Sequence, residues 1–272
     1  MKRFITMITA AVIAAAMCSC DFLDDENDDE QITTAEVVVE PSTETTMNTT
    51  PEVETPTTTT TEAPQSKAEY KVTNQSFNYY KNSIGDYEYH GIIEITNTGK
   101  SNLYLGECKF NLEDNGGHLL QVDTFISTCP DIIAPGEKGY FYNGLGSTTI
   151  DEGVSLANGI KLVPEMEVKV ADDPIVDYEV SDTSMKKGSI GEMKIVGRVE
   201  NKTSEEDSLL YIEAILYDAK GKVLAITGTN ITDLKPNSKT GFEISTGFID
   251  DTVKPEQIKS FKVIARKASI QF

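Results

Sequence analysis

The sequence contains no tryptophan, only two histidines and only four cysteines among 272 residues, so side chains that often carry acid–base chemistry or bind transition metals are scarce. Positive charge is scarce too, with 24 Lys and Arg against 44 Asp and Glu and a formal net charge of -20. Because such a chain repels polyanions, nucleic-acid binding is excluded as a function class. The sequence also contains no nucleophile elbow, phosphate loop or dinucleotide fingerprint. It therefore predicts a non-catalytic protein with no cofactor and no metal.

The first apolar run is too short for a permanent membrane span. Residues 1–20 begin with the basic pair Lys2 and Arg3, continue with an apolar run from Phe4 to Met17, and end in small residues and cysteine. A helix needs about 20 apolar residues to cross the hydrocarbon core, which this run does not reach. The order of basic, apolar and small residues is typical of a secretory signal peptide.

The end of this segment resembles the lipobox of bacterial lipoproteins, in which a cysteine after a small residue becomes a lipid-modified N-terminus. Cys20 follows Ser19, whereas Cys18 follows Met17, so Cys20 is the favoured attachment site and Cys18 the alternative. The resemblance implies an extracytoplasmic, surface-exposed protein anchored to the bacterial cell membrane, because diacyl chains hold a protein on a bilayer without protein contacts. Ordinary cleavage with secretion to the medium is the competing interpretation.

The composition changes from residue 21 to residue 68. This stretch is acidic and rich in Thr and Pro, including TTTTTEAP over 57–64, and it has no apolar periodicity. It cannot bury enough apolar surface to offset about 1–2 kcal/mol of backbone ordering per residue. We therefore expect a disordered stalk that lifts a domain off the membrane, and its threonines could carry O-linked glycans.

Short alternating apolar runs begin at residue 69 and are separated by Asn, Gly, Asp and Lys, a pattern typical of antiparallel β-sheet. The pattern occurs twice, and the two copies span 69–169 and 170–272. Equal spacings relate them: 13 residues separate Asn97 from Phe110 and Asn201 from Ala214, and three separate Asp114 from Gly117 and Asp218 from Gly221. The sequence therefore predicts an all-β protein with two tandem antiparallel β-sandwiches.

The second copy carries Leu216-Tyr217-Asp218, then Gly221, then Leu234-Lys235-Pro236. In these residues it resembles the FxLYD family of bacterial extracytoplasmic domains, and the first copy resembles a degenerate member. Ala214 stands where the family has Phe, and Glu113 in the first copy stands where the family has Tyr. The resemblance implies immunoglobulin-like β-sandwiches of the kind carried by lipoproteins, without enzymatic activity.

Alternation along the strand through Cys108 predicts which side chains share a face. With a period of two, one face is formed by Tyr104, Gly106, Cys108, Phe110 and Leu112. Cys108 and Cys129 could form a disulfide, which an exported chain permits. Alternatively, Cys108 serves as a small residue of the core.

Tyrosines gather in the first copy, which holds eight of the 11 in the chain. Tyr79 and Tyr80 precede a predicted turn at 82–86, and Tyr87 and Tyr89 follow it. Because adjacent side chains of a strand point to opposite faces, at least one ring should face outward. These four residues form a candidate ligand surface for an envelope protein or a glycan. The alternative is that the rings only cover half-exposed sheet.

The two histidines, His90 and His118, have no second histidine at metal-ligand spacing and are expected at a strand edge or on the surface. Taken together, the pattern favours a lipid-anchored surface protein that binds through tandem immunoglobulin-like domains. Two alternatives remain: a structural spacer that binds nothing, and an accessory subunit of an envelope enzyme or transporter.

Overall fold

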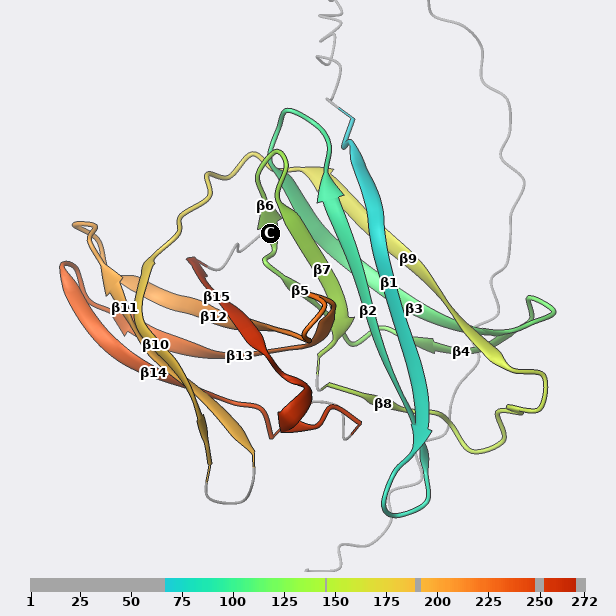
Figure 1. Ribbon diagram of the computed structural model, residues 1–272. Helices are drawn as coiled ribbons and strands as arrows, with labels where there is room; N and C mark the ends of the chain where they lie inside the picture. The colour runs from blue at the N-terminus through green and yellow to red at the C-terminus, as the bar shows by residue number, and fades with distance from the viewer. Residues whose placement is uncertain (1–66, 145, 189–191, 248–251, 268–272) are drawn as a thin grey trace, which may run out of the picture. The chain divides into compact units, whose positions relative to one another are not determined.

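The computed structural model describes four stretches of the chain, 67–144, 146–188, 192–247 and 252–267 (Figure 1). These residues belong to the compact unit 60–272. The predicted signal peptide over 1–20, with Cys18 and Cys20, lies outside the described residues, as does the predicted stalk up to residue 66. In the part of the chain that the structure describes, no helix has the length and apolarity to cross a membrane.

The first β-sandwich is built from two antiparallel sheets. One sheet has the order β1-β2-β7-β5, with β8 also paired to β2, and the other has the order β4-β3-β6, with β9 also paired to β3. The two sheets enclose a core that includes Tyr89, Phe110 and Phe141. The strands are β1 (Tyr70–Lys81), β2 (Tyr87–Asn97), β3 (Leu103–Asp114), β4 (Leu119–Asp123), β5 (Ile126–Cys129), β6 (Ile132–Ile133), β7 (Lys138–Asn143), β8 (Thr148–Thr149) and β9 (Ile160–Val170).

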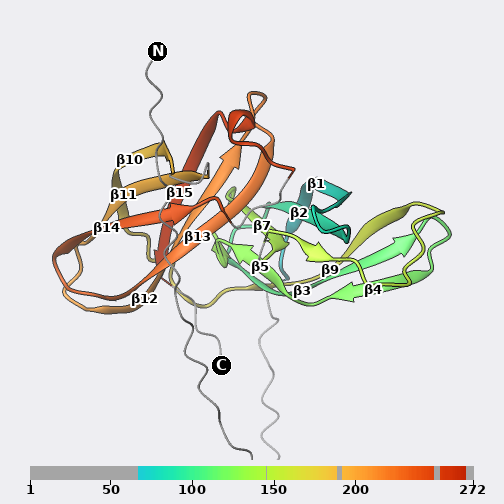
Figure 2. The ribbon, with the colours of Figure 1, turned by 90° about the horizontal axis from the view of Figure 1, so that it is seen from below.

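The second β-sandwich has two three-stranded sheets, with the orders β10-β11-β14 and β13-β12-β15 (Figure 2). Its core includes Ile212, Phe242 and Ile244. The elements are β10 (Glu179–Lys187), β11 (Met193–Asn201), β12 (Asp207–Tyr217), β13 (Val223–Leu234), β14 (Ser238–Ser245), the 3-10 helix η1 (Pro255–Gln257) and β15 (Ser260–Lys267). The predicted fold class, two tandem immunoglobulin-like antiparallel β-sandwiches, is confirmed.

Buried asparagines at equivalent positions give the repeat a physical basis. The side-chain amide of Asn97 donates to the carbonyl oxygen four residues later and to that of Ile133, at 2.9 and 3.1 Å. The amide of Asn201 donates to the carbonyl oxygen four residues later and to that of Leu234, at the same distances. Both side chains are almost fully buried. Each asparagine therefore links the loop that follows its strand to a strand of the same sandwich through two hydrogen bonds.

A β-bulge in β3 overturns one prediction made from the sequence. The register between β3 and β9 shifts between Leu105 and Cys108, so the alternation of side chains changes phase there. Leu105 and Cys108 are both buried in the core. Tyr104 and Gly106 instead line a cleft on the outside of the sandwich. The predicted face shared by Tyr104, Gly106 and Cys108 is therefore wrong, because simple alternation does not allow for the one extra residue of a bulge.

A third buried cluster joins the two sandwiches. It combines Tyr140 and Tyr142 of β7 with Ile215, Ile226 and Ile264 of the second sandwich. Each of the three isoleucines is less than one-tenth exposed. Burying one such side chain contributes about 1.5–3 kcal/mol relative to leaving it in water. The sandwiches are thus held together by an apolar contact as well as by the chain between them.

Arg266 of β15 supplies the polar part of this contact. Its Nε donates to Asp177 Oδ1 at 2.6 Å, its Nη2 donates to Glu137 Oε1 at 3.2 Å, and its Nη1 donates to the carbonyl oxygen of Ile132. The Arg266 side chain is only 8% exposed. Asp177 belongs to the second copy, whereas Glu137 and Ile132 belong to the first, so the bonds to Glu137 and Ile132 cross between the sandwiches. Because these two bonds are charge-assisted, they fix which surfaces of the two sandwiches face each other.

Candidate functional site

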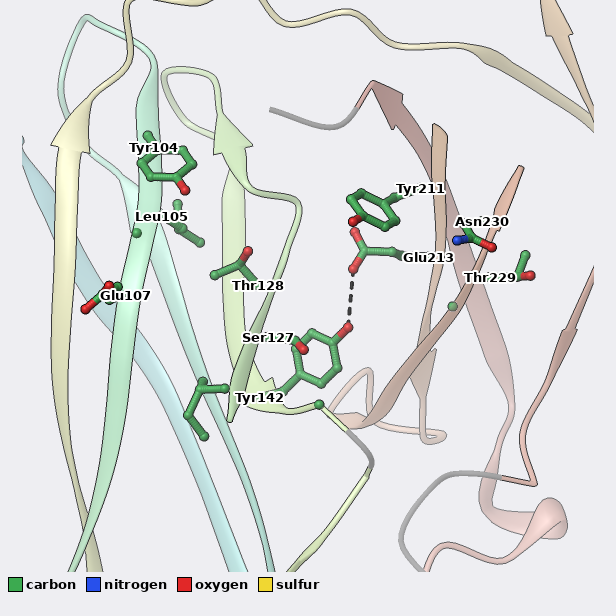
Figure 3. Close-up of a pocket in the computed structure, with 14 residues that line it drawn as sticks. Tyr104, Leu105, Glu107, Ser127, Thr128, Tyr142, Tyr211, Glu213, Thr229 and Asn230 are labelled. Carbon is green, nitrogen blue, oxygen red and sulfur yellow. Dashed lines mark hydrogen bonds between the residues drawn. The ribbon is translucent and has the colours of Figure 1, made fainter. Parts of the chain in front are cut away.

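A cleft of about 630 Å³ lies beside the joined faces of the two sandwiches (Figure 3). Strands β3, β5 and β7 of the first sandwich contribute to it, as do β12 and β13 of the second. None of the described residues that line it is Lys, Arg or His. Its aromatic, acidic and polar side chains are Tyr104, Glu107, Ser127, Thr128, Tyr142, Tyr211, Glu213, Thr229 and Asn230.

The strand geometry explains why these side chains face the cleft. In the first sandwich, the bulge in β3 turns Tyr104 outward. In the second sandwich, Tyr211 and Glu213 of β12 alternate with Ile212, which is buried in the core, so they point away from it. Gly228 lies directly opposite Glu213 in the register of β12 and β13. A Cβ added at Gly228 would lie 2.9 Å from the Ile212 carbonyl oxygen and 3.4 Å from Glu213 Cγ, so glycine allows the two strands to approach closely beside Glu213.

Glu213 is the most strongly perturbed carboxyl group of the cleft. Tyr142 Oη donates to its Oε1 at 3.3 Å, and Figure 3 shows the carboxyl group between the rings of Tyr211 and Tyr142. Burial raises the pKa of Glu213 to about 7, although hydrogen bonds from Cys129 and Tyr142 lower it in part. The carboxyl group therefore changes charge near neutral pH.

The Cys129 thiol lies on the same side, at the boundary between the sandwiches. Burial raises its pKa well above the ordinary range, and the nearby Glu213 carboxylate adds to the effect. The thiol therefore stays protonated, and it cannot serve as a thiolate nucleophile in this environment. What the cleft can offer a ligand is hydrogen bonds, ring surface and negative charge.

The tyrosine hairpin predicted from the sequence is present. Strands β1 and β2 pair Tyr79 with Tyr89 and Tyr80 with Glu88. The turn between them contains Gly85 at a φ of +104°, a conformation that glycine adopts without strain. Tyr80 Oη donates to Glu88 Oε2 at 2.8 Å. Tyr79 is 37% exposed, so the hairpin does present aromatic surface.

The structure corrects the tyrosine surface in one member. Tyr89 is fully buried, and its Oη donates to Asp123 Oδ2 at 2.8 Å. Burial and this bond raise its pKa well above the ordinary range. Tyr89 is covered because β2 is paired on both sides there, with β1 and with β8. Tyr79 instead lies on the edge strand β1, and Tyr87 lies next to the hairpin turn. Tyr87 lines a smaller cavity of about 510 Å³ with residues of the β8–β9 connection.

The structure also tests the expected positions of the cysteines and of the histidines. Cys108 and Cys129 are both free and buried, and they lie in separate apolar clusters, so the structure has no disulfide between them. Burial raises the pKa of Cys108 to about 12. His90 is only 5% exposed rather than at the surface, because its face of β2 is covered, and its Nδ1 contacts the carbonyl oxygen of Gly146. The His118 side chain is 81% exposed, as expected.

Three residues of the cleft could not be predicted as site residues from the sequence: Tyr104, Tyr211 and Glu213. Because of the bulge, alternation along β3 does not predict the outward position of Tyr104. In β12, Tyr211 and Glu213 are part of an ordinary alternating pattern that gives no sign of a site. No sequence signal marks the meeting of two strands that lie about 100 residues apart in the chain. Within the described residues, no group of three or more His, Cys, Asp or Glu is placed to hold a metal ion.

Comparison with known proteins adds little to this geometry. No protein-family model and no curated protein matches the chain. Among solved structures, it is similar to the N-terminal CBM22-1-CBM22-2 tandem domain of Paenibacillus barcinonensis Xyn10C, at 10% identity. That similarity covers 76% of this chain and 88% of the other, with a TM-score of 0.15. A TM-score this low supports no conclusion about function.

Proposed function

We propose that this protein is a non-catalytic lipoprotein of the bacterial cell surface that binds a ligand in the cleft between its two sandwiches. The observation that carries the proposal is the cleft, whose walls combine tyrosine rings with carboxyl, hydroxyl and amide groups. Tyr211 in particular is 47% exposed, although it sits in the middle of a strand. Rings exposed in this way commonly anchor binding partners, because they bury much area at little entropic cost.

The membrane part of the proposal is supported by the sequence. The signal-peptide pattern ends in Ser19-Cys20, and an acidic Thr-rich stretch separates it from the first strand at Tyr70. The resemblance to the FxLYD family, whose domains occur on lipoproteins, agrees with this placement. A lipid at Cys20 would hold the sandwiches near the membrane with their cleft available to envelope components.

Cell fractionation tests the anchor. Replacing Cys20 with Ala should move the protein from the membrane fraction to the unlipidated precursor or to the medium, whereas Cys18→Ala should leave it on the membrane. The reverse result would assign the lipid to Cys18. Membrane retention of both variants and of the double variant would contradict lipid anchoring.

Site-specific photo-crosslinking on intact cells tests the cleft. A photoreactive residue in place of Asn230, which lines the cleft and is exposed, should give crosslinked products. The matched control is Thr232, which is exposed two residues further along β13 and is outside the cleft lining. Products that form equally at both positions, or at neither, would contradict binding in the cleft and favour the structural spacer.

A further inference from the structure

We propose that the cleft recognises a cationic amine, meaning a ligand that presents an alkylammonium or guanidinium group to Glu213. This inference rests on the proposed binding function and adds the chemistry of the ligand. Both a free polyamine and a Lys or Arg side chain of a peptide carry such a group.

The charges of the lining are all of one sign. Glu107 and Glu213 supply two carboxyl groups, and no lining residue that the structure describes is Lys, Arg or His. The hydrogen bonds to Glu213 come from neutral groups, the hydroxyl of Tyr142 and the thiol of Cys129. Arg266 acts on Glu213 through space, but its guanidinium group is already paired with Glu137 and Asp177. The cleft therefore attracts a cation and repels an anion.

The rings suit the same ligand. Figure 3 shows Tyr104 on the first sandwich and Tyr211 on the second, with the Glu213 carboxyl group between Tyr211 and Tyr142. An alkyl chain can lie against these rings while its ammonium group reaches the carboxylate. An ammonium or guanidinium group over a tyrosine face gains about 0.5–1 kcal/mol at exposed sites and more when water is excluded.

The depth of Glu213 adds selectivity for a cation over a neutral hydroxyl ligand. A carboxylate removed from water is stabilised most by a partner of opposite charge. An ammonium group is such a partner, and it can donate up to three hydrogen bonds. Ser127 of β5 lies across the cleft from Glu213 and offers a further oxygen acceptor (Figure 3). A neutral ligand would leave the ionised carboxylate without a counter-charge.

Binding of a cation should depend on pH, because only the ionised Glu213 attracts it. The titratable or charged groups that face Glu213 are Tyr142 and Cys129 of the first sandwich and Tyr211 of the second, with Asp131 and Arg266 acting through space. Since the pKa of Glu213 is about 7, its ionised fraction falls about tenfold between pH 8 and pH 6. Affinity for the cation should fall by about the same factor.

Isothermal titration calorimetry on the full chain, purified in detergent at about 0.15 M salt, tests the proposal. Cadaverine represents the free amine and a tri-lysine peptide represents the side chain of a protein. Both should bind to the wild type, and Glu213→Gln should weaken binding at least tenfold and remove its pH dependence. If cadaverine binds more tightly, the ligand is a free amine; if the tri-lysine peptide binds more tightly, it is a side chain of a peptide or protein. Glu256→Gln is the matched control, because it removes one exposed carboxylate outside the cleft and should change affinity less than twofold.

Two results would overturn the proposal. If Glu213→Gln and Glu256→Gln weakened binding equally, the cations would be responding only to the net charge of the chain. If neither cation bound, and the crosslinks at Asn230 still formed and survived Glu213→Gln, the cleft would bind a ligand of another class. That second outcome contradicts the cationic chemistry and leaves the proposed binding function intact, whereas absence of crosslinks at Asn230 contradicts the function itself.

Discussion

Replacing Glu213 with Gln should alter how the stability of the protein depends on pH. Burial raises the pKa of Glu213 from 4.5 to about 7 in the folded state, so between these values the folded state holds a proton that the unfolded state has lost. Stability therefore falls as pH rises, since unfolding releases this proton. The contribution is fully present below about pH 4.5 and is lost as pH passes through 7.

The size of the effect follows from the shift. At 1.36 kcal/mol per pKa unit, the full change is about 3 kcal/mol, of which about 2–3 kcal/mol falls between pH 5 and pH 8. Gln is isosteric with Glu and still accepts the hydrogen bond from Tyr142, but it does not titrate.

Urea denaturation at pH 5, 6, 7 and 8 measures the effect as the difference in unfolding free energy between wild type and Glu213→Gln. As pH rises from 5 to 8, the unfolding free energy of the wild type should fall by about 2–3 kcal/mol relative to that of Glu213→Gln. Glu256→Gln, at an exposed site, controls for the loss of one negative charge. A difference that stays constant within about 0.5 kcal/mol would refute the description of Glu213 as a desolvated carboxyl group.

The structure makes three further predictions. Asn201→Ala and Asn97→Ala should each lower the unfolding free energy by about 1–3 kcal/mol in urea denaturation, because two hydrogen bonds of a buried amide are lost; a loss below about 0.5 kcal/mol would contradict the stabilising role of these bonds. Ile226→Ala should cost about 2–5 kcal/mol at the contact between the sandwiches, and an unchanged denaturation midpoint would mean that this contact does not form in solution. Cys108 and Cys129 should react with a maleimide only after denaturation, and rapid labelling of the native protein would contradict their burial.

The sequence predicts the fold well because its local signals agree with the tertiary structure. Alternation places Ile212 and Ala214 in the second core, where the structure has them. The equal spacing from Asn97 and Asn201 reflects two asparagines with the same hydrogen bonds. The turn at Gly85 follows from the preference of glycine for positive φ.

The site is harder to predict, for two physical reasons. Pairing of a strand with its neighbours decides where a bulge falls, so the outward position of Tyr104 cannot be seen in β3 alone. The cleft and the cluster around Ile226 also depend on which faces of the sandwiches meet, and an apolar residue on an outer face has the same appearance in sequence as one on an inner face. The group of tyrosines near Tyr79 can be seen in the sequence, so the predicted ligand surface lies on the hairpin and not in the cleft.

Binding of a ligand between the sandwiches can be measured by NMR titration of the isotope-labelled full chain with cadaverine or the tri-lysine peptide. Three glycines from different walls, Gly106, Gly144 and Gly228, line the cleft and report on it through their backbone amides. Their signals should shift together with one dissociation constant, while those of the hairpin-turn glycines Gly117 and Gly221 stay in place. Shifts at the turn glycines without shifts at the cleft glycines would contradict the account.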